Sequence, residues 1–321
     1  GVVLASAAKE YLRIYGVLVG KKPIIFTNND SAYETAIEFK NNGIDPIILD
    51  TRTNPKSEII AVAKNLGIDI KFSHVVVAAN GYKKVNSAQI AQISPDKKDL
   101  GKIEKINCDC ICVSGFWTPT IHLASQSGNK TKYDEKIDAF VPGKSKQNET
   151  TVGSANGIFN LEETINTSFE KGYELSKKIT NKDNKISIPQ VSEKNYTSHD
   201  KFWCVPLPDK KNYKRFLDFQ NDVTVSDIEL ALREGYRSIE HVKRYTTLGM
   251  ATDQGKTSNL NGLQLVSDVE NKIVPSVGHT TFRPPYTPVS IGAIVGREVG
   301  KHSKPTRKSP MHSWHEKNNA V

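Results

Sequence analysis

The chain has 321 residues, enough for about two domains, and its 37% hydrophobic content excludes a globally disordered polypeptide. No apolar run approaches the ~18 residues that cross a bilayer, and the apolar first residues lack a basic leader, so we expect a cytoplasmic protein without a membrane span or signal peptide. The net charge of +9 is denser in residues 237–256 and 297–308, which favours an anionic cofactor or an acidic partner subunit over nucleic acid. Because the chain starts on Gly1 and stops at Val321, we take it for an internal piece of a longer polypeptide.

Residues 23–50 predict a βαβ unit with two parallel strands. Residues 23–27 are a short apolar run of strand type. A helical pattern begins near Ser31 and ends at residues 42–43, an Asn-Gly pair suited to a left-handed helix C-terminus. Residues 47–50 form the second strand, whose last residue is acidic, as in dinucleotide-binding folds.

The turn between this first strand and the helix, residues 27–32, departs from the phosphate-binding fingerprint of those folds. It reads Thr-Asn-Asn-Asp-Ser-Ala, without the glycines that let backbone amides approach a pyrophosphate. The charge of Asp30 repels phosphate at the helix N-terminus, where Asp30 or Ser31 is better suited as an N-cap. The sequence therefore predicts a nucleotide-type domain that has lost its nucleotide.

The predicted α/β domain continues with further alternating elements. Residues 57–66 form an amphipathic helix, and residues 68–72 and 75–79 are rich in strand-forming residues. The Asn-Gly pair at residues 80–81 predicts a hairpin turn, and residues 106–113 predict one buried strand.

Three of the four cysteines alternate in this last strand. In an extended strand Cys108, Cys110 and Cys112 share one face. A metal site needs a fourth ligand nearby, but Cys204 is far away in sequence. We therefore interpret the cysteines as small buried residues of a reducing compartment.

A second module follows a long helix and a linker. A strand over residues 151–157 before a helix over residues 161–179 predicts either amides that face an anion or an ordinary strand–helix turn. Residues 224–227 form a capping box in which Thr and Asp satisfy reciprocal amides. Three short helices are predicted in this module, from Val225 to Gly235, from Ser238 towards Gly249, and from Gly255 through Val269.

Several long stretches resemble the α subunit of bacterial heterotetrameric sarcosine oxidase. They are residues 26–33, 113–117, 218–224, 233–250, 252–259, 282–289 and 310–315. Because these stretches are long and are spread over the chain, the resemblance covers essentially its whole length.

This resemblance implies an α/β fold with Rossmann-type dinucleotide-binding domains of the FAD/NAD-linked disulfide-oxidoreductase kind. A small all-α module follows that is similar to a ferredoxin-like 2Fe–2S domain without its cysteines. The implied organisation is 1–112, the second dinucleotide-type (NAD-like) domain; 113–180, the return into the first FAD/NAD-type domain; 181–212, a linker; 213–270, the helical module; and 271–321, a connector into an aminomethyltransferase-like folate domain.

The family's complex demethylates sarcosine oxidatively to glycine, with hydrogen peroxide and either formaldehyde or 5,10-methylenetetrahydrofolate as products. The resemblance implies NAD in the first dinucleotide domain, mostly outside these residues, FMN shared with the β subunit, FAD in the β subunit and tetrahydrofolate in the folate domain. It implies β, γ and δ subunits as partners. Because the amine-oxidising site belongs to β, we expect no catalytic residue here and an inactive isolated chain.

The helical module departs from its cluster-bearing relatives at the ligand positions. Asp218 and Gln220 stand where a Cys-x-Cys pair is expected, and Asp253 falls in the return loop. Thiolates are required to hold a 2Fe–2S cluster, so we predict neither a cluster nor another metal site.

The resemblance also implies two sets of cofactor-binding residues. An FMN phosphate at a subunit seam needs cations and exposed amides, although Lys243 and Arg244 are alternatively the surface of an exposed helix. The FMN candidates are Lys243, Arg244, Thr247, Gln254, Gly255, Lys256, Thr257 and Arg283. The NAD candidates, at a place where related folds have a Gly-Asp pair, are Gly153, Ser154, Ala155 and Asn156, and the Asp is absent here.

Alternative functions remain open at this point. A subunit of N-methylglutamate or proline dehydrogenase shares the architecture, but the replaced cluster cysteines favour sarcosine oxidase. An independent NAD-dependent oxidoreductase is disfavoured because the βαβ unit lacks a phosphate loop. A nucleic-acid binder is disfavoured because no aromatic and basic platform is present.

Overall fold

The computed structural model describes residues 1–115, 117–183, 187–191, 199–208, 213–296, 300 and 307–320. Part of the predicted linker and part of the basic stretch 297–308 lie outside these residues, as does Phe116. No helix in the described ranges is long and apolar enough to cross a membrane.

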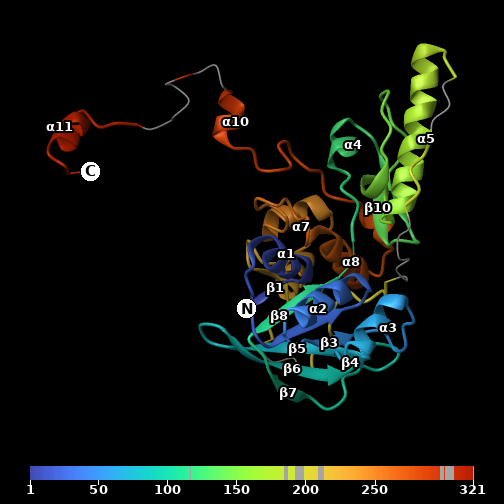
Figure 1. The fold of residues 1–321 in the computed structure, drawn as a ribbon, viewed down its shortest axis with the longest axis vertical. Helices are drawn as coiled ribbons and strands as arrows, with labels where there is room; N and C mark the ends of the chain where they lie inside the picture. The colour runs from blue at the N-terminus through green and yellow to red at the C-terminus, as the bar shows by residue number, and fades with distance from the viewer. Residues whose placement is uncertain are drawn as a thin grey trace.

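A five-stranded parallel sheet is the centre of the first part of the chain (Figure 1). Its strands are β1 Val2–Leu4, β2 Pro23–Thr27, β3 Ile47–Asp50, β4 Asp69–Phe72 and β8 Cys110–Ser114. They lie in the order β1-β8-β2-β3-β4, and each neighbouring pair is parallel, which confirms the predicted α/β class. Because the chain runs outward from β2 through β3 to β4, with β8 on the other side, the strand order reverses beside β2.

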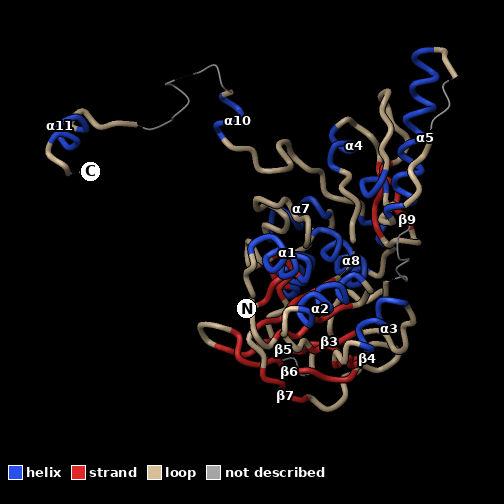
Figure 2. Tube along the Cα trace, in the orientation of Figure 1, coloured by secondary structure: helices blue, strands red, loops and turns tan. Residues whose placement is uncertain are grey.

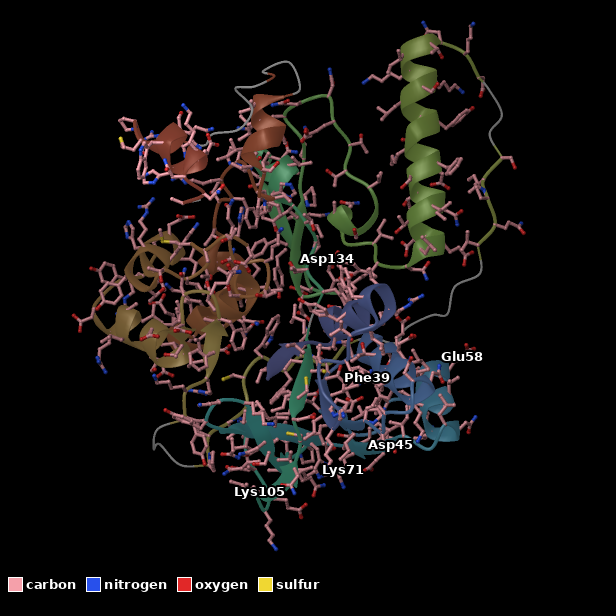
Figure 3. The ribbon with its side chains drawn as sticks, turned by 60° about the vertical axis from the view of Figure 1, so that its left-hand side comes forward. Phe39, Asp45, Glu58, Lys71, Lys105 and Asp134 are labelled. Atoms are coloured by element: carbon pink, nitrogen blue, oxygen red, sulfur yellow. The ribbon has the colours of Figure 1, made fainter. Side chains whose placement is uncertain are left out.

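Three helices cover one face of this sheet. They are α1 Ala5–Tyr15, α2 Ser31–Asn41 and α3 Glu58–Asn65. Helix α2 forms where predicted because its apolar side chains recur on one side, and Phe39 is wholly buried there in one core with Ile25 and Ile48 (Figure 3). Glu58, the first residue of α3, is exposed on the outer surface (Figure 3).

A three-stranded antiparallel sheet covers the opposite face. Its strands are β5 His74–Gly81, β6 Val85–Gln92 and β7 Glu104–Asn107. Because side chains alternate along a strand, Ile24 of β2 faces this second core, together with Ile90 of β6. Residues 80–81 are still paired with β6. The hairpin turn therefore lies at residues 82–84, directly after the predicted position.

The single strand predicted over residues 106–113 is two strands in different sheets. Between β7 and β8, the Asp109 carboxylate accepts hydrogen bonds of 2.8 Å from the backbone amides of Lys21 and Lys22. These bonds fix the break, and they come from residues far away in the sequence.

The prediction that three cysteines share one face is therefore wrong for one of them. Cys110 and Cys112 point to the same side of β8, with their Sγ atoms 3.7 Å apart under the helices. Cys108 lies outside both strands and is buried in the core of the opposite face.

A hairpin and a long helix follow the parallel sheet. The elements are α4 His122–Gln126, β9 Thr131–Asp134, β10 Ala139–Pro142, the 3-10 helix η1 Gly153–Asn156 and α5 Leu161–Thr180. The predicted long helix is confirmed as α5, but the strand expected before it is the short η1. Helix α5 stands beside the hairpin and buries none of its residues (Figure 1).

The helical module contains the predicted three helices and a short β-ladder. Its elements are β11 Phe216–Asp218, β12 Val223–Thr224, α6 Val225–Arg233, α7 Ile239–Thr246, α8 Asn259–Glu270 and α9 Val274–Val277. The capping box is confirmed, since the Asp227 carboxylate accepts a hydrogen bond of 2.7 Å from the Thr224 amide. Ile121 and Phe140 from the preceding segment share the core of this module.

Two short helices end the described chain. Helices α10 Ile291–Val295 and α11 His312–Lys317 lie away from the two sheets and the helical module (Figure 2). Neither contains a buried residue.

Candidate functional site

The loop between α7 and α8, residues 247–258, contains most of the predicted FMN candidates. Thr247, Gly249 and Gly255 all have left-handed backbone conformations, with φ of 64°, 66° and 76°. The buried Asp218 carboxylate on β11 accepts hydrogen bonds from the amides of Gly249 at 2.8 Å and Gln220 at 3.0 Å. The carboxylate therefore anchors the start of this loop to the β-ladder.

The first residue of α8 fixes the rest of the loop. Asn259 Nδ2 donates a hydrogen bond of 2.9 Å to the Gln254 carbonyl. The Asn259 amide packs so closely against Gly249 and Gly255 that a Cβ on either glycine would overlap with it. Both positions therefore need glycine for space as well as for their φ angle.

Gln254 joins the loop to the segment around Arg283. Its Nε2 donates to the carbonyls of Arg283 at 2.7 Å and Pro285 at 3.1 Å, while its Oε1 accepts from the Arg283 amide at 2.8 Å. We call this set of bonds the Gln254 clasp. It brings two of the predicted cations, Lys256 and Arg283, into the same exposed region.

An aromatic stack lies beside the clasp. The ammonium of Lys256 is 4.5 Å from the ring centroid of Tyr286, which is a cation–π contact. The other ring in this stack is His122 of α4, whose centroid is 3.8 Å from that of Tyr286. Burial and the nearby charge of Lys256 lower the pKa of His122. The loop is therefore packed against the segment that precedes the linker.

The remaining FMN candidates lie in the last turn of α7 and directly after Lys256. Lys243 is half-buried and Arg244 is exposed, both in the last turn of α7, where cations complement the helix dipole. Neither takes part in the Gln254 clasp or the aromatic stack. Thr257 is exposed directly after Lys256.

The predicted NAD candidates, residues 153–156, form the η1 turn. Gly153 is buried with φ of 64°, and its missing side chain leaves room for Thr164 of α5. The N-terminus of α5 itself is already satisfied, because the Asn160 side chain accepts from the Glu163 amide at 2.9 Å. Two carboxylates in the first turn of α5 add negative charge there, which disfavours an anion at this helix terminus.

Sequence reasoning missed a buried ion-pair cluster at the carboxyl end of the parallel sheet. Arg52 pairs with Asp30 and Asp50, each at 2.8 Å, and Tyr33 donates a hydrogen bond of 2.7 Å to Asp50. Burial and the Asp50 charge raise the pKa of Tyr33, and both carboxylates raise the pKa of Arg52 against the opposing effect of burial. The only indication in the sequence is an arginine two residues after the acidic strand end.

Comparisons with known proteins find similarity to sarcosine oxidase subunits. A family model described as the sarcosine oxidase A3 domain matches residues 212–297. The chain is 36% identical to sarcosine oxidase subunit alpha of Rhizobium meliloti (strain 1021), over 100% of the chain and 31% of that relative. It is 34% identical to the subunit alpha of Corynebacterium sp. (strain P-1), over 98% of the chain and 33% of that relative. The chain is thus a homologue of this oxidoreductase subunit and spans about a third of the length of the curated relatives it matches.

One solved structure supports the fold. The crystal structure of L-proline dehydrogenase from P. horikoshii matches with a TM-score of 0.55, over 92% of this chain and 54% of that chain. The sequence identity is 19%, so this likeness concerns the fold alone.

Proposed function

We propose that this chain is part of the α subunit of a sarcosine oxidase and that it supplies cofactor-binding and subunit-interface surface to the complex. The observation that supports this most strongly is the 36% identity to a sarcosine oxidase subunit alpha along the entire chain. The complex would demethylate sarcosine to glycine, with hydrogen peroxide and formaldehyde or 5,10-methylenetetrahydrofolate as products. The amine-oxidising FAD would belong to the β subunit, so the chain alone would be inactive. We also propose that the complex contains γ and δ subunits and that a folate domain lies outside these residues.

The exposed region around the Gln254 clasp is the proposed FMN-phosphate surface. Its donors fit an anion, because Lys256 and Arg283 are cations and Thr257 adds a hydroxyl. FMN would supply one- and two-electron transfer between FAD and oxygen at this seam. The proposed role of the chain is to bring the two cations near each other, because the Gln254 side chain binds the backbone of Arg283. Lys243, Arg244, Thr247 and Gly255 extend this proposed surface along α7 and the loop.

We propose residues 153–156 as a contact for NAD in the first dinucleotide domain. The turn offers backbone amides next to a glycine with positive φ, which allows close approach of a phosphate. The carboxylates at the start of α5 disfavour a phosphate at the helix terminus itself, which leaves η1 as the contact.

The helical module is proposed to work without an iron–sulfur cluster. At the first expected ligand position, Asp218 uses its carboxylate to bind the amides of Gly249 and Gln220. A hydrogen-bonded carboxylate thus joins the β-ladder to the loop after α7 at a position where a cluster would require a thiolate.

The FMN proposal is tested by reversing one charge. In the complex with its β partner, we expect Lys256→Glu to lower the FMN content, because a carboxylate repels the phosphate dianion. Lys105→Glu, at an exposed lysine of β7 (Figure 3), is the matched control and should leave the FMN content unchanged. FMN and FAD are released and counted separately per complex. Equal FMN in the wild-type protein and in Lys256→Glu would remove Lys256 from the flavin site.

Substrate preference separates the main proposal from its alternative. The purified complex is offered sarcosine, proline and N-methylglutamate, and oxygen consumption is followed. We expect oxygen-dependent turnover to be fastest with sarcosine. Preference for proline or N-methylglutamate, with an acceptor other than oxygen, would assign the chain to an amine dehydrogenase instead.

A further inference from the structure

The carboxyl edge of the parallel sheet is where open α/β sheets bind their ligands, at the point where the strand order reverses. Here that point lies beside β2, between the ends of β2 and β8. A dinucleotide bound there would need the space between these two strand ends, the N-terminus of α2 for its phosphates, and the acidic end of β3 for a ribose. The structure uses all three places for contacts within the chain.

The two strand ends are bonded directly to each other. Asn29, in the turn after β2, donates from Nδ2 to the Gly115 carbonyl at 2.6 Å and to the Ser114 hydroxyl at 3.3 Å. The indole nitrogen of Trp117 donates to the Ser31 hydroxyl at 3.2 Å. Because Ser31 is the first residue of α2, Trp117 lies at the helix end that would face a phosphate.

The acidic end of β3 has no acceptor capacity left for a ribose. Asp50 Oδ1 accepts from the amide and Nε of Arg52 at 2.9 and 3.0 Å. Its Oδ2 accepts from Tyr33 at 2.7 Å and from Arg52 Nη2 at 2.8 Å. These four bonds use the roughly four lone-pair sites of a carboxylate. The guanidinium also binds Asp30, so both acids that a nucleotide would meet are paired with one internal cation.

A segment from far along the chain lies over this edge. The Asp200 amide donates to the Asn28 carbonyl at 3.0 Å, and Asn28 Nδ2 donates back to the Asp200 carbonyl at 2.9 Å. The Asp200 carboxylate accepts from the Thr51 hydroxyl at 3.4 Å and forms an ion pair with Lys97. Two loops of the parallel sheet and the β6–β7 loop of the antiparallel sheet therefore bind one residue.

The two neighbours of Asp200 bind a different part of the molecule. His199 Nε2 lies 3.2 Å from an oxygen of Asp138, and the Lys201 ammonium lies 2.6 Å from the other oxygen. Asp138 is buried in the turn between β9 and β10, where Tyr133 also donates to it. Residues 199–201 thus contact the sheet on one side and the β9–β10 hairpin on the other.

We propose that the dinucleotide crevice of this domain has become a docking site for the chain's own residues 199–201, which fasten the parallel sheet to the β9–β10 hairpin. The domain then binds neither NAD(H) nor NADP(H) at this edge. The inference is independent of the proposed FMN surface and of the proposed NAD contact at residues 153–156, because it concerns a different set of residues.

Hydrogen–deuterium exchange on the intact α subunit in its complex tests the loss of nucleotide binding. NADH and NADPH are added at millimolar concentration, and amide exchange is compared in residues 27–32 and 50–52. We expect the exchange rates of these peptides to stay the same with either nucleotide. This should hold even where the nucleotide slows exchange in another region. Protection of residues 27–32 or 50–52 would overturn the proposal.

The fastening role is tested with Asp200→Ala. We expect amides in residues 50–52 and in the loop around Lys97 to exchange on the order of five- to tenfold faster, because both loops lose the Asp200 carboxylate that binds Thr51 and Lys97. Lys201→Met removes the ion pair with Asp138 and should accelerate exchange in the β9–β10 hairpin. The control is Asp45→Ala, which removes an exposed ion pair with Lys40 on the same domain (Figure 3). Unchanged exchange in the two loops of Asp200→Ala, or in the hairpin of Lys201→Met, would contradict the proposal. If Asp200→Ala does not fold, Lys97→Met removes one partner of the Asp200 carboxylate and should accelerate exchange in the loop around Lys97.

Discussion

Two glycines determine the shape of the loop that holds the proposed FMN cations. In Gly255→Ala, the added methyl group overlaps with Asn259, and the residue must also adopt a φ of 76°. We expect this change to lower the free energy of unfolding by about 1–3 kcal/mol. Gly172→Ala is the control, because it has open space on α5 and should be neutral or stabilising by up to ~1 kcal/mol. Denaturant unfolding of both variants measures the difference, and equal effects would contradict the packing described for the loop.

His122 should make the stability of the protein depend on pH. Burial and Lys256 hold its pKa in the folded state below the ordinary value of 6.5, so the unfolded state binds the proton more readily. As the pH falls below 6.5, the unfolded state takes up protons first, and stability decreases until the lowered folded pKa is passed.

The expected measurement is a fall in unfolding free energy between about pH 7 and about pH 5 that is smaller in His122→Gln than in the wild-type protein. His241→Gln, at an exposed histidine of α7, is the control and should retain the wild-type dependence. A wild-type slope in His122→Gln would show that other groups cause it.

For single residues, the sequence indicated the character of a side chain better than it indicated which other residue that side chain contacts. Asp30 was recognised as an anomaly for nucleotide binding and Asp50 as the acidic strand end that is typical of dinucleotide-binding folds, because their charge and position can be read locally. Their shared partner Arg52 was not recognised, because only the folded sheet places the ends of β2 and β3 side by side.

At the scale of elements, the start of α6 offers a direct test of a local signal. Thr224→Ala removes one half of the capping box, and we expect it to cost about 1 kcal/mol of stability. Ser238→Ala is the matched control, because Ser238 precedes α7 without a side-chain capping bond and should cost less. Thermal or urea unfolding ranks the two variants, and the reverse order would contradict the capping role.

Elements with a clear local pattern were predicted correctly, whereas those fixed by distant contacts were not. Helices α2, α3, α5 and α6 have amphipathic patterns and end signals that need no tertiary information. The break between β7 and β8 depends on Asp109 meeting the amides of Lys21 and Lys22, which are 88 and 87 residues away. A continuous apolar pattern cannot reveal such a break.

At the scale of the whole molecule, the hairpin and the helical module share one core. Phe140 of β10 packs with Ile228 and Val242 in this core. We expect Phe140→Ala to cost about 3 kcal/mol and to accelerate amide exchange in α7 as well as in the hairpin. Phe39→Ala, in the separate core under α2, should accelerate exchange around the parallel sheet and leave α7 unchanged. Protection of α7 that survives Phe140→Ala would mean that the module is stable without the hairpin.

The candidate site also depends on contacts between residues that are far apart in the sequence, which sequence patterns do not reveal. The polar residues of the loop were predicted as a group because they lie in one continuous stretch. Arg283 joins them through the Gln254 clasp, which spans 29 residues in the sequence. Lys256 also contacts Tyr286, and the stacked His122 comes from before the linker, so the complete arrangement exists only in the folded chain.

The shared core has a consequence for where this protein can be cut or exchanged. The family model begins at residue 212, but the apolar side chains that complete the module include Ile121 and Phe140, which precede it by many residues. An excised piece with the model's boundaries would expose the surface that these two side chains cover. A transplant into another scaffold would therefore need to bring the hairpin along, and recombination during evolution would meet the same requirement.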